Sequence, residues 1–214
     1  MRIKTFNEYI NEQNNNLNEN FWKWFGSSKI VENGKPIVVY HQNLDGDNTF
    51  NIFKPQSFGD FGENSMFYFA KDKNWIKNFV KRFDKSQLSQ KPRNFYLKIE
   101  NPLNLKGVKL TPKEWIEFLK DKKLLTSSIE EKLKNEPEIR YMKRNELFSW
   151  VIYRYDNGEF VNKLKSVGYD GIIQDDSNYG RSNDITTYVA ISPNQIKSID
   201  NDGSFDLDDD NIYS

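Results

Sequence analysis

The chain has 214 residues, enough for one full domain with a hydrophobic core but too few for two complete domains. Lysine plus arginine and aspartate plus glutamate number 31 each, so the formal net charge is zero, and we expect neither nucleic acid nor an anionic membrane as a partner. The sequence has no cysteine and one histidine, which excludes disulfides, thiolate zinc sites, cysteine nucleophiles and histidine-rich metal sites. We therefore expect no bound metal. No run approaches the roughly 20 apolar residues that span a bilayer.

The first 20 residues differ in character from the rest. Four apolar residues recur there at the spacing of an amphipathic helix: Ile3, Phe6, Tyr9 and Ile10. The segment QNNNLNEN that follows is an asparagine-rich linker with little to bury. The apolar centre of a secretion signal is missing. By these features alone residues 1–20 are a frayed terminus, and the domain is expected to comprise residues 21–214.

The remaining chain predicts a mixed α+β domain. Five segments have the composition and the bounding turns of strands: KPIVVYH (35–41), SMFYFA (65–70), NFYLKIENPLNL (94–105), YDGIIQ (169–174) and TTYVAIS (186–192). The third is expected to end at Pro102, because proline cannot donate to a sheet ladder. Strands and helices do not alternate regularly, so a split antiparallel sheet fits better than a doubly wound parallel sheet.

A helical insertion is predicted at about residues 111–167. It begins with the capping box Thr111-Pro112-Lys113-Glu114, which has proline at the first helical position. The segments SSIEEKLKN, RNELFSWVIYRY and GEFVNKLKSVG continue it as helices, and Gly168 closes the last one. The insertion is interpreted as target recognition or as domain bulk.

Several side chains have the chemistry of a site. His41 ends a buried strand at a loop, and either a functional imidazole or a structural one bonded to backbone suits that position. Tyr68, Phe69 and Phe79 can stack on a planar ring or belong to the core. The acidic run DLDDD (206–210) lacks the glycine and spaced ligands of an EF-hand, so we expect a solvated tail.

Six segments, taken in order, share a pattern with known proteins. They are WFGSSKIVENGKPIVVYHQN, FYFAKDKNWIKNFV, NFYLKIENPLNL, GYDGII, YVAISPNQIKSI and NDGSFDLDDDNIYS. The pattern resembles the ADP-ribosyltransferases, and most closely the small domains of this type in phage polyvalent proteins. The resemblance covers about residues 21–214. It implies an ADP-ribosyltransferase fold and a His-Tyr-Glu triad that binds NAD+ as substrate, as in the branch related to diphtheria toxin and the poly(ADP-ribose) polymerases.

The resemblance also implies roles for individual residues. His41 is the triad histidine that hydrogen-bonds the nicotinamide ribose, and the backbone of Gln42 holds the carboxamide where relatives have glycine. Tyr68 is the triad tyrosine, which packs on the nicotinamide ring. Phe79 closes the other face of the ring, and Phe69 is included among the NAD+-binding aromatic residues.

The third catalytic position is Thr187, where relatives have glutamate. A threonine can hydrogen-bond the ribose but supplies no charge for the developing cation. Asp175, Asp176 or Asp184 can in principle supply a carboxylate from nearby. Gln195 is interpreted as a structural part of the closing turn.

The leader MRIKTFNEYINE resembles the capsid-targeting peptide of internal head proteins in T-even-type bacteriophages, which a prohead protease removes after Leu/Ile-x-Glu. Such sites end here at Glu12 and Glu19, and a third match, Ile129-Glu130-Glu131, falls within a predicted helix. Together the resemblances predict a mono-ADP-ribosyltransferase carried in the phage capsid interior and delivered to the host cytoplasm, where it modifies a host protein. The alternatives are a catalytically degenerate domain that binds NAD+ or a partner, and an internal structural head protein.

Overall fold

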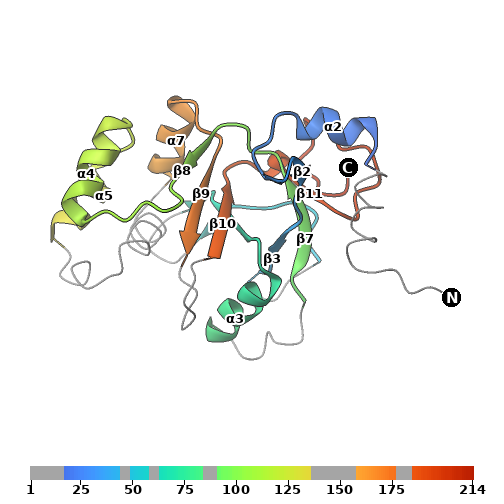
Figure 1. Cartoon of the computed structure of the whole chain (residues 1–214), viewed down its shortest axis with the longest axis horizontal. Coiled ribbons are helices and arrows are strands. Elements are labelled where there is room, and N and C mark those ends of the chain that lie inside the picture. Colours follow the sequence, from blue (N-terminus) through green and yellow to red (C-terminus); the bar gives the residue numbers. More distant parts are fainter. Residues whose placement is uncertain (1–16, 44–48, 58–62, 84–90, 136–157, 177–184) are drawn as a thin grey trace.

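The fold is organised around one large sheet (Figure 1). The computed structural model describes residues 17–43, 49–57, 63–83, 91–135, 158–176 and 185–214. Seven strands follow the order β11-β7-β3-β6-β10-β9-β8, and only β8 and β9 run parallel. Their bounds are β3 Val39–His41, β6 Phe67–Ala70, β7 Arg93–Leu97, β8 Pro102–Asn104, β9 Gly171–Asp176, β10 Ile185–Ala190 and β11 Ile196–Ser198. Two short hairpins flank the sheet: β1 (Val31–Glu32) with β2 (Lys35–Pro36), and β4 (Gln56–Ser57) with β5 (Glu63–Asn64). The predicted α+β class with a split sheet is confirmed.

All five predicted strand segments contain strands, but two differ in detail. KPIVVYH begins as β2 of the first hairpin, and only its last three residues form β3. The prediction for NFYLKIENPLNL was wrong at its end: β7 stops at Leu97, and Pro102 begins β8. Because β8 is an edge strand, a proline at its first residue leaves no ladder hydrogen bond unmade.

The helices are α2 (Glu19–Phe25), α3 (Lys73–Phe83), α4 (Pro112–Asp121), α5 (Ser127–Asn135) and α7 (Glu159–Ser166), with a 3-10 turn η4 (Pro193–Gln195). The predicted capping box is confirmed, since Thr111 N donates to the Glu114 carboxylate at 2.6 Å and Glu114 N donates to Thr111 Oγ1 at 3.4 Å. Gly168 follows α7 with φ 88°, a left-handed conformation that favours glycine. RNELFSWVIYRY lies outside the described residues. No helix in the described ranges is long and apolar enough to cross a membrane.

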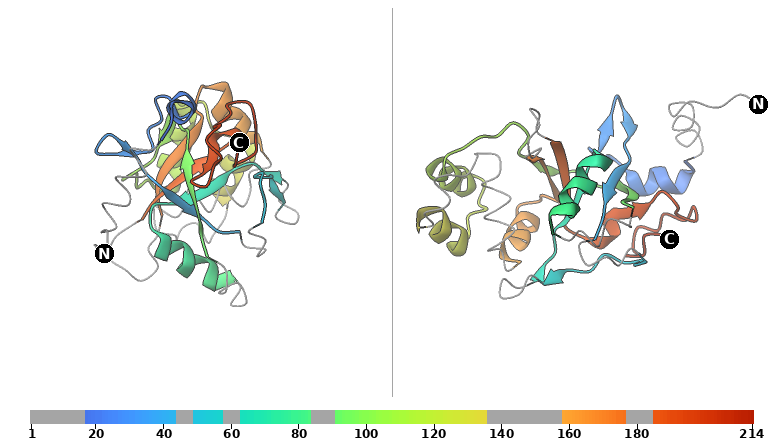
Figure 2. Two further views of the ribbon diagram at one scale, coloured as in Figure 1. Left: turned by 90° about the vertical axis from the view of Figure 1, so that its right-hand side faces the viewer. Right: turned by 90° about the horizontal axis from the view of Figure 1, so that it is seen from below.

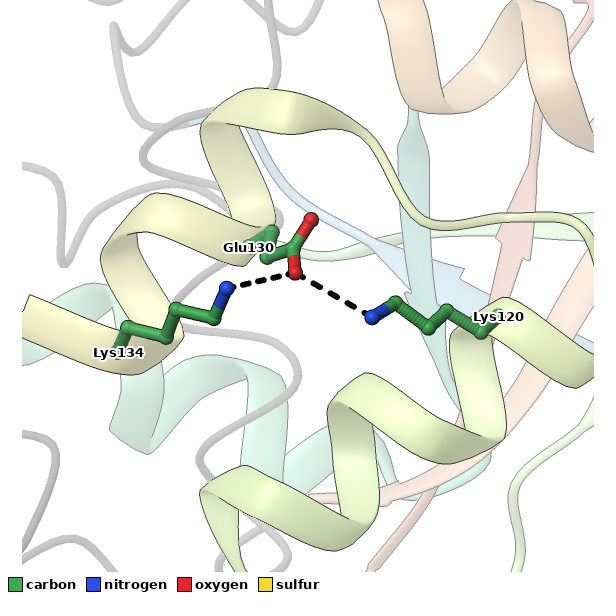
Figure 3. A network of polar contacts seen from close by, with 3 residues as sticks. All are labelled: Lys120, Glu130 and Lys134. Carbon is green, nitrogen blue, oxygen red and sulfur yellow. Dashed lines mark hydrogen bonds and ion pairs between the residues drawn. The ribbon is translucent and has the colours of Figure 1, made fainter.

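An ion-pair network joins α4 to α5 (Figure 3). Glu130 Oε1 lies 2.8 Å from Lys134 Nζ and 3.4 Å from Lys120 Nζ. The hydrogen bond from Lys134 is the main cause that holds the pKa of Glu130 below its usual value. The tripeptide Ile129-Glu130-Glu131 is therefore held inside α5, with Ile129 fully buried.

The two faces of the sheet bury different side chains. We call the side that carries Phe67, Phe69 and Phe95 the aromatic face; loops and the C-terminal segment cover it. We call the opposite side, which carries Ala70 and Val189, the helical face. Helices α4, α5 and α7 cover its β8 end, and α3 packs on Ala70 (Figures 1 and 2). Strand alternation assigns each residue of the central strands to one face.

Helix α2 draws part of the predicted linker into the fold. Asn18 caps α2, with its Oδ1 accepting from Phe21 N at 2.9 Å and its Nδ2 donating to Gly203 O at 2.6 Å. Leu17 packs against the aromatic cluster around Phe21. The cleavage site predicted after Glu19 therefore lies within the first turn of α2.

We predict that a chain beginning at Asn20 is less stable than one beginning at Gln13. It loses the cap and the Leu17 contact and places a positive α-amino group at a helix N-terminus, at a combined cost of about 1 to 2 kcal/mol in the free energy of unfolding. Urea denaturation of both chains measures this cost. Asn20→Ala in the longer chain is the control, because Asn20 also donates to Gly203 O but caps nothing. Equal midpoints for the two chains would contradict the prediction.

Candidate active site

His41 lies where the large sheet splits. Strands β3 and β6 are joined by a single register pair, Tyr40 with Ala70, and diverge beyond it. The imidazole Nδ1 of His41 lies 2.7 Å from the backbone oxygen of Tyr68. It thus satisfies a carbonyl on β6 that β3 no longer reaches, and buried carbonyls are costly to leave unpaired. Gln42, the next residue, is buried, so its side chain occupies interior space beside the split.

This hydrogen bond fixes the tautomer of the neutral imidazole. A carbonyl oxygen can only accept, so Nδ1 carries the proton and Nε2 presents a lone pair. Nε2 lies 2.9 Å from the side-chain amide of Asn43. The amide oxygen Oδ1 of Asn43 is the atom placed toward Nε2, so a neutral ring with its proton on Nδ1 requires the Asn43 amide to be turned by 180°, with its NH2 group toward Nε2. The acceptor at Nε2 can equally take a hydrogen bond from a ligand hydroxyl.

Aromatic rings hold the imidazole in place. Its ring centroid lies 5.0 Å from Phe53, 5.3 Å from Phe69 and 6.3 Å from Phe50. The expectation that Phe69 binds NAD+ is corrected here, because its ring is 1% exposed and packs in the core of the aromatic face. Phe69 positions His41 and is closed to a ligand.

Thr187 and Tyr68 share the helical face. Four residues lie opposite one another across neighbouring strands: Tyr40, Ala70, Thr187 and Gln174. Tyr68 lies one step along β6, opposite Val189, which places it diagonally from Thr187. Thr187 is 2% exposed, and its Oγ1 has no hydrogen-bond partner in the described part of the chain. The structure therefore brings Tyr68 and Thr187 together on one face and joins His41 to Tyr68 through the backbone.

The predicted pair of ring-stacking aromatics is divided between two clusters. Tyr68 packs with the cluster under α4, α5 and α7, and its hydroxyl lies 3.9 Å from Met66 Sδ. Phe79 packs with the cluster under α3 and stacks on Trp75, with ring centroids 5.2 Å apart and an interplanar angle of 18°. One face of the Phe79 ring is therefore already covered by Trp75.

A pocket of about 480 Å³ opens beside the helical face of the sheet, next to the start of α3. Its walls are Tyr40, Ile185 and Thr186 from the strands and residues 71–74, which lead into α3. Lys73 Nζ lies 5.4 Å from the centre of the Tyr40 ring. Burial, and secondly the charge of Asp72, raise the pKa of Tyr40, so its phenol stays neutral at physiological pH. The volume is in the range of small-molecule sites. Within the described ranges, no cluster of histidine and acidic side chains is arranged to hold a metal ion.

The acidic and amide side chains considered as functional groups near Thr187 have different surroundings. Asp175 Oδ2 accepts from Gly107 N at 2.7 Å, and Asp176 ends β9 opposite Ile185. Asp184 lies outside the described residues. The structural role of Gln195 is confirmed: its Oε1 accepts from Ile191 N and Ser192 N, and its Nε2 donates to the carbonyls of Lys98 and Asp170.

The C-terminal segment supports the loop that packs on His41. Ile212 N donates to Asn51 O at 2.8 Å, and Ile212 is fully buried. Arg93, opposite His41 in the β3–β7 register, donates to Phe50 O and to the Tyr213 hydroxyl, each at 2.8 Å. Its guanidinium carbon lies 4.5 Å from the centre of the Phe50 ring. Arg93 thus holds Phe50 against the imidazole in two ways, by a hydrogen bond to its backbone oxygen and by the contact of the guanidinium group with its ring.

The acidic run DLDDD has mostly exposed side chains, as expected of a solvated segment, but the backbone at its end bonds a buried lysine. Lys197 is 0% exposed, and its Nζ donates to the carbonyls of Asp209 and Asn211 at 2.9 and 2.8 Å. Burial lowers the pKa of Lys197, and the surrounding aspartates oppose this effect. The run keeps exposed carboxylates while its backbone is packed.

Sequence reasoning missed Asn43, Arg93, Phe50 and Phe53, which contact His41 directly or through one another. Of these four residues, only Asn43 could have been suspected from the sequence, because it lies two residues from His41. The other contacts join segments remote in sequence, and no periodic pattern reports them.

The sheet thus splits beside a histidine, with a tyrosine on the adjoining strand and a pocket next to the following helix. The chain matches the family described as ADP-ribosyltransferase in polyvalent proteins over residues 32–205, and it belongs to this family. Enzymes of this class use NAD+ as the donor of ADP-ribose. Comparison with curated proteins and with solved structures gives no match.

We predict that Arg93→Ala lowers the free energy of unfolding by about 2 kcal/mol, because it removes two charge-assisted hydrogen bonds. Arg93→Lys should recover only part of this loss, since an ammonium group lacks the planar fork. Tyr213→Phe is the matched control, because it removes one of the two acceptors and keeps the ring. Guanidinium denaturation gives the three values. The prediction fails if Arg93→Ala costs no more than Tyr213→Phe.

Proposed function

We propose that the protein is a mono-ADP-ribosyltransferase that transfers ADP-ribose from NAD+ to a host protein. The observation that carries this proposal is the geometry of His41: Nδ1 is bound to the Tyr68 carbonyl, so Nε2 can accept from a ribose hydroxyl. Family membership supports the reaction class. The pocket beside Tyr40 has the volume of a small-molecule site, and its walls do not include His41, Tyr68 or Thr187.

The residues present fit this substrate in part. Tyr40 lines the pocket with an aromatic ring, and a positively charged nicotinamide ring gains stacking and cation-π energy of about 1 to 2 kcal/mol on such a surface. Thr187 Oγ1, without a partner among the described residues, is a potential hydrogen-bonding group. Position 187 supplies no negative charge.

The reaction needs positioning and electrostatics more than covalent help. The bond between ribose C1' and nicotinamide breaks, and its electron pair leaves with the nicotinamide nitrogen, so positive charge develops on the ribose. A nucleophile of the acceptor protein then bonds to C1' and loses its proton to a base. His41 would orient the ribose, and ordered groups around the reacting carbon supply most of the rate acceleration.

Two variants of His41 separate chemistry from folding. His41→Asn keeps an amide NH2 near the position of Nδ1, so the Tyr68 carbonyl retains a donor, whereas His41→Ala leaves it unpaired. Nicotinamide release from NAD+ by the chain beginning at Gln13 should be abolished in both, and only His41→Ala should also lower the unfolding temperature. Turnover by His41→Asn at the rate of the unsubstituted chain would contradict the assignment of the site.

A second candidate function is a domain that binds NAD+ without catalysis. The observation that favours it is Thr187, which replaces the glutamate expected from the resemblance. Calorimetric binding of NAD+ with no release of nicotinamide and no labelling of a host lysate identifies this case. A purely structural head protein would bind no NAD+ at all.

The leader underlies a proposal about location. A protein packaged in the phage capsid and processed by the prohead protease would reach the host cytoplasm with the genome. Mass spectrometry of virions should then find a chain beginning at Gln13, because cleavage after Glu19 removes the cap of α2. A chain in virions that still begins at Met1 would exclude the cleavage.

A further inference from the structure

We infer that Asn43 occupies, in the free protein, the hydrogen-bonding position at His41 that a ribose hydroxyl takes when substrate binds. This inference rests on the proposed transferase function and assigns a regulating residue to its site. The side-chain amide of Asn43 lies 2.9 Å from His41 Nε2. A ligand that bonds this nitrogen must displace Asn43, so the side chain competes with substrate and lowers its apparent affinity.

Nε2 is the atom of the imidazole at which a ligand must bind. The ring has two nitrogen atoms that form hydrogen bonds. Nδ1 lies 2.7 Å from the backbone oxygen of Tyr68 in β6, a carbonyl that β3 no longer reaches. Phe53 and Phe69 pack on the ring, with centroids 5.0 and 5.3 Å from its own. A hydroxyl that bonds His41 therefore takes the place of Asn43 at Nε2.

Asn43 holds this position in either orientation of its amide. With the NH2 group toward Nε2, the amide donates to a neutral ring. With Oδ1 toward Nε2, the amide oxygen accepts from a ring that carries a proton on each nitrogen and a positive charge. In both cases Nε2 is engaged before substrate arrives. Only the neutral ring can accept from a ribose hydroxyl once Asn43 has turned away.

The side chain of Asn43 can leave without breaking the sheet. Strand β3 ends at His41, and its last register pair with β7 joins His41 to Arg93. Asn43 lies two residues beyond this pair and is half-buried, whereas Gln42 between them is buried. Water can therefore receive the displaced amide, and the buried neighbour keeps the backbone in place. The apparent affinity for substrate then scales with the fraction of molecules in which Nε2 is free.

Two substitutions of Asn43 give opposite results if it competes with substrate. Asn43→Ala frees Nε2, so calorimetric NAD+ affinity and kcat/KM for nicotinamide release should rise about 2- to 10-fold, the net effect of one neutral hydrogen bond. Asn43→Asp keeps the size, but a carboxylate only accepts, so it draws a proton onto Nε2 and removes the acceptor. Its kcat/KM should be below that of the unsubstituted chain and recover as pH rises and the ring loses this proton. A merely structural Asn43 predicts a loss in both variants, without this pH dependence.

The other groups around the ring stay the same in this comparison. Arg93 faces His41 from β7. The side chains that pack on the ring from β6, β7 and residues 49–57 are uncharged: Phe50, Phe53, Phe69 and Phe95. Because Arg93 is present in all three chains, a pH dependence that differs between them arises at position 43.

A second measurement reports on the contact without substrate. The chain has one histidine, so isotope-labelled histidine gives NMR signals from His41 alone. Asn43→Ala should shift the Nε2 signal of the free protein and leave Nδ1 as a protonated nitrogen. Addition of NAD+ to the unsubstituted chain should move the Nε2 signal again.

The outcomes separate the role of Asn43 from the proposed function. If the unsubstituted chain binds NAD+ and releases nicotinamide but Asn43→Ala binds NAD+ no more tightly, the role of Asn43 is overturned and the transferase function stands. An Nε2 signal that Asn43→Ala leaves unmoved overturns this role too. If NAD+ binds without release, the transferase function fails and the affinity comparison alone decides the role of Asn43. If the unsubstituted chain neither binds NAD+ nor releases nicotinamide, both are overturned.

The unfolding temperature of each variant shows whether it is folded. Should Asn43→Ala fail to fold, the similarly sized Asn43→Leu, which lacks the amide, is judged by the same measurements.

Discussion

The hydrogen bond between His41 and the Tyr68 carbonyl allows the sheet to divide. Where β3 leaves β6, a side chain must pair with the backbone carbonyl that β3 no longer reaches, and the imidazole does so while its second nitrogen lies against Asn43. The sheet geometry and the proposed catalytic geometry therefore depend on one residue. The ring packing around His41 and the contacts that hold that packing follow from this requirement.

Much of the fold was predictable because it follows local rules. Alternating apolar residues located the strands that carry His41, Tyr68 and Thr187, and the capping box located α4. The same alternation shows that Tyr68 and Phe69, as adjacent strand residues, cannot line one pocket together. The expectation that both residues contact NAD+ gave more weight to residue type than to strand geometry.

What could not be predicted depends on contacts between distant segments. Pro102 looks like the end of a strand until β8 is known to be an edge. The packing of the acidic run becomes visible only once Lys197 is seen beneath it, since a buried ammonium group can organise carbonyl oxygens as a bound cation would.

The helical face of the sheet carries two separate hydrophobic clusters, which the order of the elements in the sequence does not reveal. Helix α3 and its cluster lie on one side of Thr187, and the cluster of α4, α5 and α7 lies on the other. Substrate chemistry is expected on the α3 side, where the pocket opens. The insertion instead supplies a wall of apolar packing behind Tyr68, which favours its interpretation as domain bulk.

The link from Ile212 and Tyr213 to the His41 region has a consequence for biosynthesis. His41 leaves the ribosome early, whereas the residues that fasten its surrounding loop are translated much later. Proteins fold progressively as they emerge, so the nascent domain lacks this fastening until late in synthesis. The loop that packs on His41 can therefore be fastened only after residues 212 and 213 have left the ribosome.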